Sequence, residues 1–319
     1  MPSDRTVSVG LILAVVSSVT FGLSGPLAKS LIDAGWSSAG AVLVRIGGAA
    51  AVLVVVLAVS RPGVLAAVRG DGPALLVYGA LAVAGVQVAF FNAIRYLPVS
   101  VALLLEYLGP VLVIAWVWVV RRQPAGRRTL LGGAVAITGL LLVVQVWSGG
   151  ALDPAGVAWG LGAAVCQASY FLVADRAGAT TPPLVLTGVG MVVGTVVVAV
   201  LGLVGALPVV LPVPTTGPVV LAGAEVGWFT AAALLVGVST VVAYLTGVAA
   251  IARIGAARGA LVALLEVVTS TLAAWLLLGE LPGAFQLAGG VLILTGVVLT
   301  RTAPAAVDVP PLDYPRRRR

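Results

Sequence analysis

PVSVALLLEYLGPVLVIAWVWVVRRQ, residues Pro98–Gln123, decides the fold, because it is an almost unbroken apolar run with a single carboxylate inside it. A run of this length fits a membrane span, which needs about 20 residues to cross roughly 30 Å of hydrocarbon. The carboxylate, Glu106, lies about 12 Å into the run at ~1.5 Å per residue. A charge at that depth costs about 3 kcal/mol or more unless it is paired, protonated or hydrated. The stretch therefore predicts a membrane helix whose glutamate has a structural or functional partner.

The composition extends this interpretation to the whole chain. The 319 residues are 61% hydrophobic and only 9% charged, whereas a soluble domain is about 25% charged. The apolar runs are continuous rather than alternating with the period of two that an outer-membrane barrel would require. The sequence therefore predicts an all-α integral membrane protein that crosses the bilayer many times.

Several classes of chemistry are disfavoured by what the sequence lacks. It has no histidine, the commonest metal ligand and near-neutral proton relay. Its single cysteine, Cys166, excludes an intramolecular disulfide. No P-loop, GxSxG, HExxH or CxxC motif is present, so the chain is not an ATP-driven pump on its own. We expect no cofactor, no metal, no catalytic residues and no nucleic acid partner.

Ten apolar runs are candidate transmembrane helices, and short connections rich in Gly, Pro, Asp and Arg separate most of them, as is typical of turns. One connection, residues 206–226, is long, apolar and Pro-rich, and we expect it to lie along the membrane interface. The ten runs are residues 8–30, 38–60, 73–94, 98–120, 129–147, 155–174, 183–205, 227–251, 256–278 and 284–301.

The basic residues predict the orientation of these spans, because Lys and Arg gather on the cytoplasmic side of a membrane. With the N-terminus inside, fifteen of the eighteen Lys and Arg residues fall in cytoplasmic segments. Lys29 and Arg95 fall on the outer side, and Arg45 lies within a span. Both termini are therefore predicted to be cytoplasmic.

The chain also contains an internal repeat at an offset of 157 residues. TLLGGAVAITGLLL (residues 129–142) matches QLAGGVLILTGVVL (residues 286–299). Each half then has five spans, and an odd number of spans repeated in tandem enters the membrane from opposite sides. We predict two inverted repeats, residues 1–147 and 148–301, followed by a disordered basic tail, residues 302–319. Many secondary transporters have this architecture, with a site near the membrane midplane.

The repeat places a second glutamate beside the first. At the same offset Gly109 falls on Glu266, so the fourth and ninth spans each carry one mid-membrane glutamate within a helical turn of equivalence. Glu266 has no obvious cation partner within the membrane, so it is either protonated or faces a hydrated cavity, and we expect the cavity.

Four pieces of sequence resemble the EamA-type members of the drug/metabolite transporter superfamily: AIRYLPVSVALLLEYLGPV (93–111), ARIGAARGALVALLEVV (252–268), LLLGELPGAFQLAGGVLILTGVVL (276–299) and the Arg45 of VLVRIGGAA. The resemblance implies ten helices, cytoplasmic termini, a central cavity and alternating access. SGPLAKSL (24–31) with LEYLGPV (105–111) resembles the branch of threonine and homoserine exporters. Glu266-Val267 stands where the family often has Glu-Pro, which leaves open whether the ninth span breaks as the fourth does near Pro110.

The charged candidates for the substrate site each have two interpretations. Glu106 either binds a substrate amine or a proton, or serves as the structural partner of Arg45, which lies at a similar depth. Lys29 either attracts a substrate carboxylate or extends to the interface, as lysines near helix ends do. Other charged residues at loop edges, Arg95, Asp33 and Glu280, are expected to be solvated.

Amides and phenols within the spans complete the predicted site. Such groups suit a polar metabolite, although any one of them can instead join helices. They are Gln87, Asn92, Tyr107, Gln167, Tyr170 and Tyr244. GxxxG motifs at Gly156–Gly160 and Gly190–Gly194 favour close packing within the chain, and the sequence leaves open whether the protein is a monomer or a homodimer.

We therefore expect a secondary transporter of a small polar metabolite in the bacterial inner membrane, exporting amino acids or related compounds. Rocking of the two repeats would expose the site to each side in turn, with exchange of a carboxylate proton for substrate as a candidate coupling step. Two alternatives are an integral-membrane enzyme on lipid-linked substrates, which would need convergent acid and base groups, and a channel, which would need a continuous polar stripe.

Overall fold

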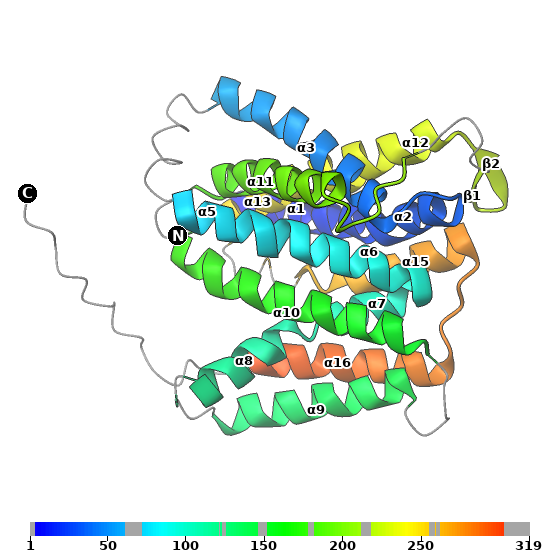
Figure 1. Cartoon of the computed structure of the whole chain (residues 1–319). Coiled ribbons are helices and arrows are strands. Elements are labelled where there is room, and N and C mark those ends of the chain that lie inside the picture. The colour runs from blue at the N-terminus through cyan, green and yellow to red at the C-terminus, as the bar shows by residue number, and fades with distance from the viewer. Residues whose placement is uncertain are drawn as a thin grey trace, which may run out of the picture.

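The computed structural model describes residues 4–60, 72–120, 122, 126–145, 152–177, 182–211, 218–254, 259 and 262–302. The described residues form a bundle of helices that run roughly along a common axis, with a small two-stranded sheet (Figure 1). The elements are α1 (Asp4–Gly22), α2 (Ser24–Asp33), α3 (Ser38–Ser60), α5 (Gly72–Val77), the π-helix η1 (Tyr78–Gly85), α6 (Val86–Tyr96), α7 (Val99–Glu106), α8 (Gly109–Val120), α9 (Arg127–Val144), α10 (Pro154–Ala177), α11 (Pro183–Leu203), β1 (Val219–Leu221), β2 (Ala224–Val226), α12 (Trp228–Ala233), the π-helix η3 (Leu234–Val242), α13 (Ala243–Ile254), α15 (Leu265–Leu278) and α16 (Ala284–Thr302).

Helix length and composition make this a multi-pass membrane protein. Large apolar side chains such as Val59 and Leu203 remain 81% and 87% exposed, which suits contact with lipid rather than water. The count of ten spans stays a prediction, because several apolar helices are too short to cross alone. Five stretches are long enough to cross: Thr6–Asp33, Ser38–Val59, Gly72–Tyr96, Pro183–Leu203 and Trp228–Ile254. Shorter apolar helices are Val99–Val113, Leu130–Val144, Leu265–Leu278 and Ala284–Leu299.

The β-hairpin marks one end of the bundle, here called the hairpin end; α1 begins and α16 ends at the other, here called the termini end (Figure 1). β1 and β2 pair antiparallel, and Ala222 (φ 52°) and Gly223 (φ 76°) form the two-residue turn that joins them. The backbone N–H of Ala222 donates to the carbonyl of Leu277 at 2.8 Å. The predicted interfacial segment thus includes a hairpin attached to the end of α15.

The repeated glycine motif forms the contact between α9 and α16, which lie side by side at the lower edge of the bundle (Figure 1). A Cβ atom added at Gly139 would lie 2.6 Å from the carbonyl oxygen of Gly289, and a Cβ atom added at Gly289 would lie 2.6 Å from the carbonyl oxygen of Gly139. Gly296 approaches the carbonyl of Gly132 in the same way. The residues that revealed the repeat in the sequence therefore let the last helices of the two halves meet backbone to backbone.

We expect Gly139→Ala to destabilise the protein by about 1–3 kcal/mol, the range for overpacking of a tight contact. The added methyl group would meet backbone atoms of Gly289 and Ile293, which cannot rotate away. Gly133→Ala on the same helix is the matched control, because its nearest neighbour, Val111 Cγ1, would be 3.9 Å away. Thermal unfolding of the purified variants compares them, and equal losses would show that this contact is not tight.

The GxxxG motifs also pack within the chain. Gly156 and Gly160 on α10 lie against Leu97 and Leu105, and Gly190 on α11 lies against Tyr78. These contacts confirm the prediction of intramolecular packing at both motifs.

The third and eighth spans each contain a π-helix at equivalent places in the two repeats. Gly85, the last residue of η1, falls on Val242, the last residue of η3, at the offset of 157. In η3 the hydroxyl of Thr240 donates to the carbonyl of Leu235, five residues earlier, at 2.7 Å. Such π-helical turns are rare and occur frequently at functional sites. Here they precede Gln87 and Tyr244, which are themselves equivalent at this offset.

The fourth and ninth spans are both broken beside their glutamates. In the fourth span, Tyr107 and Leu108 form a turn between α7, which ends at Glu106, and α8. Pro110 is the second residue of α8, where a missing N–H leaves no helix bond unmade. In the ninth span, a turn at Ala263 and Leu264 precedes α15, whose first turn holds Glu266. The ninth span therefore breaks as the fourth does, although it has no proline at this place.

Tertiary hydrogen bonds satisfy the carbonyl groups that the break in the ninth span frees. The hydroxyl of Ser18 on α1 lies 3.1 Å from the carbonyl of Val262 and 2.9 Å from that of Ala14 in its own helix, and the hydroxyl of Tyr107 lies 3.0 Å from the carbonyl of Ala263. A membrane offers no water for these groups, so internal partners are required. The two breaks therefore contact each other, one contributing the tyrosine and the other the carbonyl.

Candidate functional site

The side chain of Arg45 is the centre of the buried polar cluster. Arg45 lies on α3 and is 2% exposed. Its Nη1 donates to Oε1 of Gln87 on α6 at 2.6 Å, and its Nε donates to Oγ1 of Thr240 in η3 at 3.1 Å. The guanidinium also lies 5.5 Å from the ring centre of Phe91, within cation–π range. Arg45 thus joins the second and third spans of the first repeat to the eighth span of the second.

The predicted pair between Arg45 and Glu106 is wrong. Among the described residues the ion pair that forms joins Lys29 to Glu280, and the hydrogen bonds of Arg45 go to the neutral oxygens of Gln87 and Thr240. Glu106 and Glu266 lie near enough to act on Arg45 electrostatically, but neither contacts it. The guanidinium has five N–H donors and binds a carboxylate with two of them at once. A buried arginine with neutral partners is therefore well suited to receive an anionic group from outside the chain.

Glu266 and Tyr107 are brought together by the two helix breaks. Oε2 of Glu266 lies 3.1 Å from the hydroxyl of Tyr107, and the same hydroxyl lies 3.0 Å from the carbonyl of Ala263. The position of Glu266 in the first turn of α15 also favours a negative charge, because the free N–H groups of a helix point toward that end. The sequence predicted both residues but not their contact.

Glu106 is half-buried at the last position of α7. No hydrogen bond or ion pair of its carboxylate is found among the described residues. A Cβ at Gly109 would lie 2.9 Å from Cγ of Gln167 on α10, so this amide borders the same break. Glu106 and Gln167 thus lie beside the break in the fourth span, near the cluster but not bonded to Arg45.

The other predicted site residues divide between the cluster and its surroundings. Tyr244 on α13 packs edge-on against Phe21, with ring centres 4.7 Å apart, and acts electrostatically on Arg45. Asn92 donates to the carbonyl of Val88 in its own helix at 2.8 Å, an interaction internal to α6. The side chain of Tyr170 lies outside the described residues.

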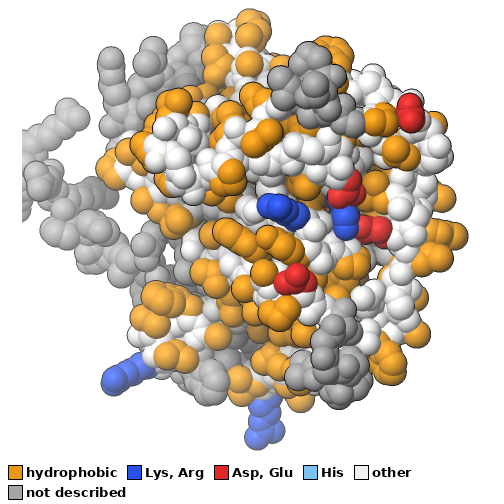
Figure 2. All heavy atoms as spheres, turned by 45° about the vertical axis from the view of Figure 1, so that its right-hand side comes forward, with side chains coloured by type: hydrophobic (Ala, Val, Ile, Leu, Met, Phe, Trp, Pro, Cys, Tyr) orange, Lys and Arg blue, Asp and Glu red, His pale blue; other side chains and the backbone are white. Residues whose placement is uncertain are grey.

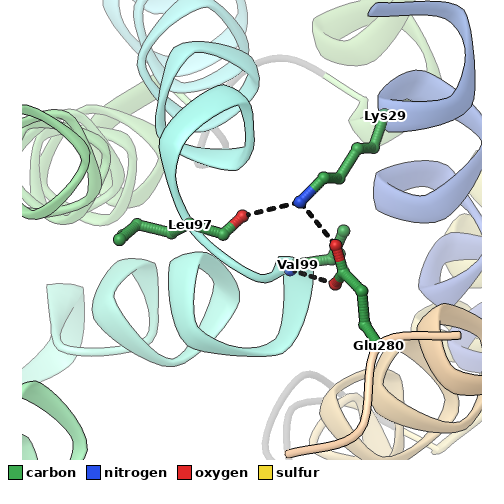
Figure 3. Close-up of polar contacts among 4 residues, drawn as sticks. All are labelled: Lys29, Leu97, Val99 and Glu280. Atoms are coloured by element: carbon green, nitrogen blue, oxygen red, sulfur yellow. Dashed lines mark hydrogen bonds and ion pairs between the residues drawn. The ribbon is translucent and has the colours of Figure 1, made fainter. Parts of the chain in front are cut away.

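Lys29 forms a second polar cluster at the hairpin end, here called the clasp, which joins Lys29, Leu97, Val99 and Glu280 (Figure 3). Nζ of Lys29 lies 2.5 Å from Oε1 of Glu280 and donates to the carbonyl of Leu97 at 3.1 Å. Oε2 of Glu280 accepts from the backbone N–H of Val99, the first residue of α7, at 2.9 Å. The clasp therefore ties the first and fourth spans to the end of the ninth.

The clasp corrects the prediction for Glu280 and gives Lys29 partners that the sequence did not predict. Glu280 was expected to be solvated, yet the side chains of Lys29 and Glu280 are only 17% and 18% exposed and bond to each other. Lys29 was expected to bind substrate or to extend to the interface; in this structure it bonds to Glu280 and to the carbonyl of Leu97, and a role in substrate binding stays a prediction. Arg95 is exposed, as expected, and lies 5.7 Å from the ring centre of Tyr96.

A cavity of about 590 Å³ also lies at the hairpin end, between α2, the hairpin and the end of α15. Ser30, Asp33, Trp275 and Glu280 line it, together with the turn of the hairpin. Figure 2 brings this end forward and shows acidic and basic side chains close together near the middle of a largely uncharged face. The central cavity around Arg45 stays a prediction. Among the described residues no group of His, Cys, Asp and Glu is arranged to hold a metal ion.

Sequence reasoning missed Thr240, Phe91 and Ala263 as members of the cluster. A backbone carbonyl such as that of Ala263 carries no sequence signal. Thr240 could have been found only through the π-helix, since an extra residue in the turn changes which face its side chain occupies. Phe91 lies four residues from Gln87, one turn along the same helix.

Comparison with known proteins agrees with this architecture. The sequence matches the EamA-like transporter family twice, over residues 8–145 and 154–302. It is 27% identical over 272 residues to the "Uncharacterized transporter YyaM" of Bacillus subtilis (strain 168), covering 83% of this chain and 84% of that protein. It is 29% identical over 197 residues to the "Threonine/homoserine exporter RhtA" of Salmonella typhimurium (strain SL1344), covering 61% and 62%. A solved crystal structure with 21% identity has a TM-score of 0.55 over 93% of this chain and 96% of that one, which supports the fold.

Proposed function

Because this chain belongs to the EamA-like transporter family and is a multi-pass membrane transporter of a small molecule, we propose that it exports a small amino acid. The relative RhtA, named for threonine and homoserine export, matches part of the chain, and supports substrates of that size. The relatives named above are transporters, and we propose no enzymatic role.

The observation that carries the proposal is the charge arrangement around Arg45. A guanidinium with neutral partners suits the carboxylate of an amino acid, and two glutamates, Glu106 and Glu266, lie within its electrostatic reach. A carboxylate beside the break of a membrane helix suits an ammonium group. The cluster therefore offers one positive and two negative groups to a zwitterion, an arrangement that neither a simple amine nor a simple acid would use fully.

We further propose alternating access with the hairpin end outside and both termini in the cytoplasm. The placement of basic residues supports this orientation, and the clasp then closes the outer side. α7 and α15, which both run between the glutamates and the hairpin end, pack together, while α8 packs against α10 and α16. These contacts support a structure closed outside, and opening would require the clasp to separate.

Counterflow into proteoliposomes that contain the purified full chain tests the proposal. Vesicles loaded with unlabelled L-threonine should accumulate labelled L-threonine from outside, and excess homoserine should compete. Vesicles without protein and vesicles loaded with 1-amino-2-propanol, which lacks the carboxylate, are the controls. Flux that does not saturate would indicate a channel, and the absence of exchange with any amino acid in a panel would contradict the proposed substrate class.

A further inference from the structure

The hydroxyl of Tyr107 lies between two groups that normally accept hydrogen bonds. One is the carbonyl oxygen of Ala263 at 3.0 Å, and the other is Oε2 of Glu266 at 3.1 Å. A tyrosine hydroxyl has a single proton to donate, a carbonyl oxygen can only accept, and a carboxyl group can donate only when it carries a proton. The protonation state of Glu266 therefore decides which of these bonds can form.

When Glu266 is protonated, both bonds form at once. Its carboxyl group donates to the oxygen of Tyr107, and Tyr107 donates to the carbonyl of Ala263. That carbonyl also accepts from the backbone N–H of Glu266 at 3.0 Å, so the turn before α15 is held from two sides. When Glu266 is ionised, Tyr107 donates to the carboxylate instead, since a charge-assisted bond is the stronger one. The carbonyl of Ala263 then loses its bond to the fourth span.

We propose that Glu266 is the carboxylate that binds the coupling proton, and that Tyr107 is a positioning residue that links this proton to the contact between the two helix breaks. In each cycle one proton binds Glu266 from one side of the membrane and leaves to the other, and no bond other than O–H changes. This inference rests on the proposed transport function and specifies which of the two mid-membrane glutamates takes the proton.

We assign the coupling proton to Glu266 rather than to Glu106 because a change of charge at Glu266 alters a hydrogen bond between the two helix breaks. Glu266 has a tyrosine that can respond to its charge, whereas Glu106 forms no hydrogen bond among the described residues. Arg45 and Glu106 are the charged groups that act on this region electrostatically. The elements packed on α15 are α1, α2, α7 and β1. Their remaining charged residues lie at the ends of the bundle: Asp4 and Arg5 at the termini end, and Lys29 and Asp33 at the hairpin end.

Infrared difference spectroscopy during a pH titration of the purified full chain in nanodiscs tests the assignment of the proton to Glu266, and it needs no substrate. The wild type should show a protonated carboxyl band that titrates, Glu266→Gln should lose it, and Glu106→Gln should keep it. Tyr107→Phe should keep the band but move it to higher frequency, because the carboxyl group loses its hydrogen-bond partner. Tyr244→Phe removes another hydroxyl of the same cluster and should leave the frequency unchanged.

The outcomes separate this inference from the proposed function. A titrating band that is lost in Glu106→Gln, or a Tyr107→Phe spectrum identical to the wild type, would overturn the inference even if L-threonine is transported. If the spectra behave as expected but no amino acid is exchanged, the proton site stands and the proposed substrate class is wrong. The absence of any titrating carboxyl band would also overturn the inference.

Discussion

Lys29→Glu is expected to move the protein by about 30-fold toward the state that is open at the hairpin end. The change removes the ion pair with Glu280 and the bond to the carbonyl of Leu97, and it places two carboxylates side by side. Exposed ion pairs contribute up to about 1 kcal/mol, and breaking a buried one costs about 3–5 kcal/mol. The ion pair of the clasp is partly buried, so we expect its loss to cost about 2 kcal/mol, between these two values. A change of about 2 kcal/mol corresponds to the expected shift of about 30-fold.

The reversed pair, Lys29→Glu with Glu280→Lys, is expected to restore little of this loss. Glu280 accepts from the N–H of Val99 at the start of α7, where a helix favours a negative charge and disfavours a positive one. Lys29 donates to a carbonyl, which a glutamate at the same place cannot do. The clasp therefore depends on the direction of its charges and not only on their opposite signs.

Labelling of Ser30→Cys by a membrane-impermeant maleimide measures how much of the protein is open at the hairpin end. Ser30 lines the cavity beside the clasp but is only 3% exposed, and Cys166→Ala removes the native thiol. Labelling should be slow with the clasp intact and faster in Lys29→Glu, while Arg95→Glu, an exposed basic residue with no part in the clasp, should match the parent. Full restoration by the reversed pair, or equal labelling in every variant, would contradict the argument.

The sequence predicted the larger features of this fold because they depend on long, repeated patterns. Apolar runs predicted the membrane helices, and the Gly132–Gly139 motif together with its repeat at Gly289–Gly296 predicted the two repeats that the family model matches. The inverted orientation of these repeats stays a prediction. The structure shows why this motif is the strongest trace of the repeat, since these glycines meet backbone to backbone and a side chain would separate the helices.

The contacts of the candidate site could not be predicted in the same way, because they depend on small departures from regular helices. The break in the ninth span has no proline and is supported instead by Ser18 and Tyr107 from other spans. The π-helix in the eighth span turns Thr240 toward Arg45. A sequence pattern gives the depth of Arg45 and Glu106, but not the rotation of their helices, and the expected pair between them failed for this reason.

Arg45→Gln is expected to weaken the binding of L-threonine by about 10- to 150-fold while leaving the fold intact. A hydrogen bond to a charged group contributes about 1.5–3 kcal/mol, and each 1.4 kcal/mol is about tenfold in affinity. The amide of glutamine ends near the position of the arginine Nε, so it can keep the bond to Thr240, and the helices around position 45 keep one polar link although the bond to Gln87 is lost. Arg45→Lys retains the charge but not the two-pronged geometry, and its affinity should fall between those of the wild type and Arg45→Gln.

Isothermal titration with L-threonine and with 1-amino-2-propanol isolates the role of the guanidinium. The wild type should bind the amino acid more tightly than the amine, and Arg45→Gln should remove most of that difference with little effect on the amine. Arg95→Gln, which also removes a positive charge, should leave both affinities unchanged. If Arg45→Gln weakens both ligands equally, Arg45 does not contact the substrate carboxylate.

Affinity should fall without a loss of stability in Arg45→Gln, and this separates a substrate-binding arginine from a structural one. Arg45 is 2% exposed and forms no ion pair with a described carboxylate, so its charge is desolvated with only neutral partners. Removing a charge that has no direct ion-pair partner from the membrane interior relieves part of a cost of about 3 kcal/mol, which offsets the lost hydrogen bonds, so the apparent melting temperature should rise or stay unchanged. An arginine that served to hold the helices together would lose stability and affinity in parallel. We expect this buried charge to serve the carboxylate of the cargo, because Arg45 forms no ion pair with any carboxylate among the described residues.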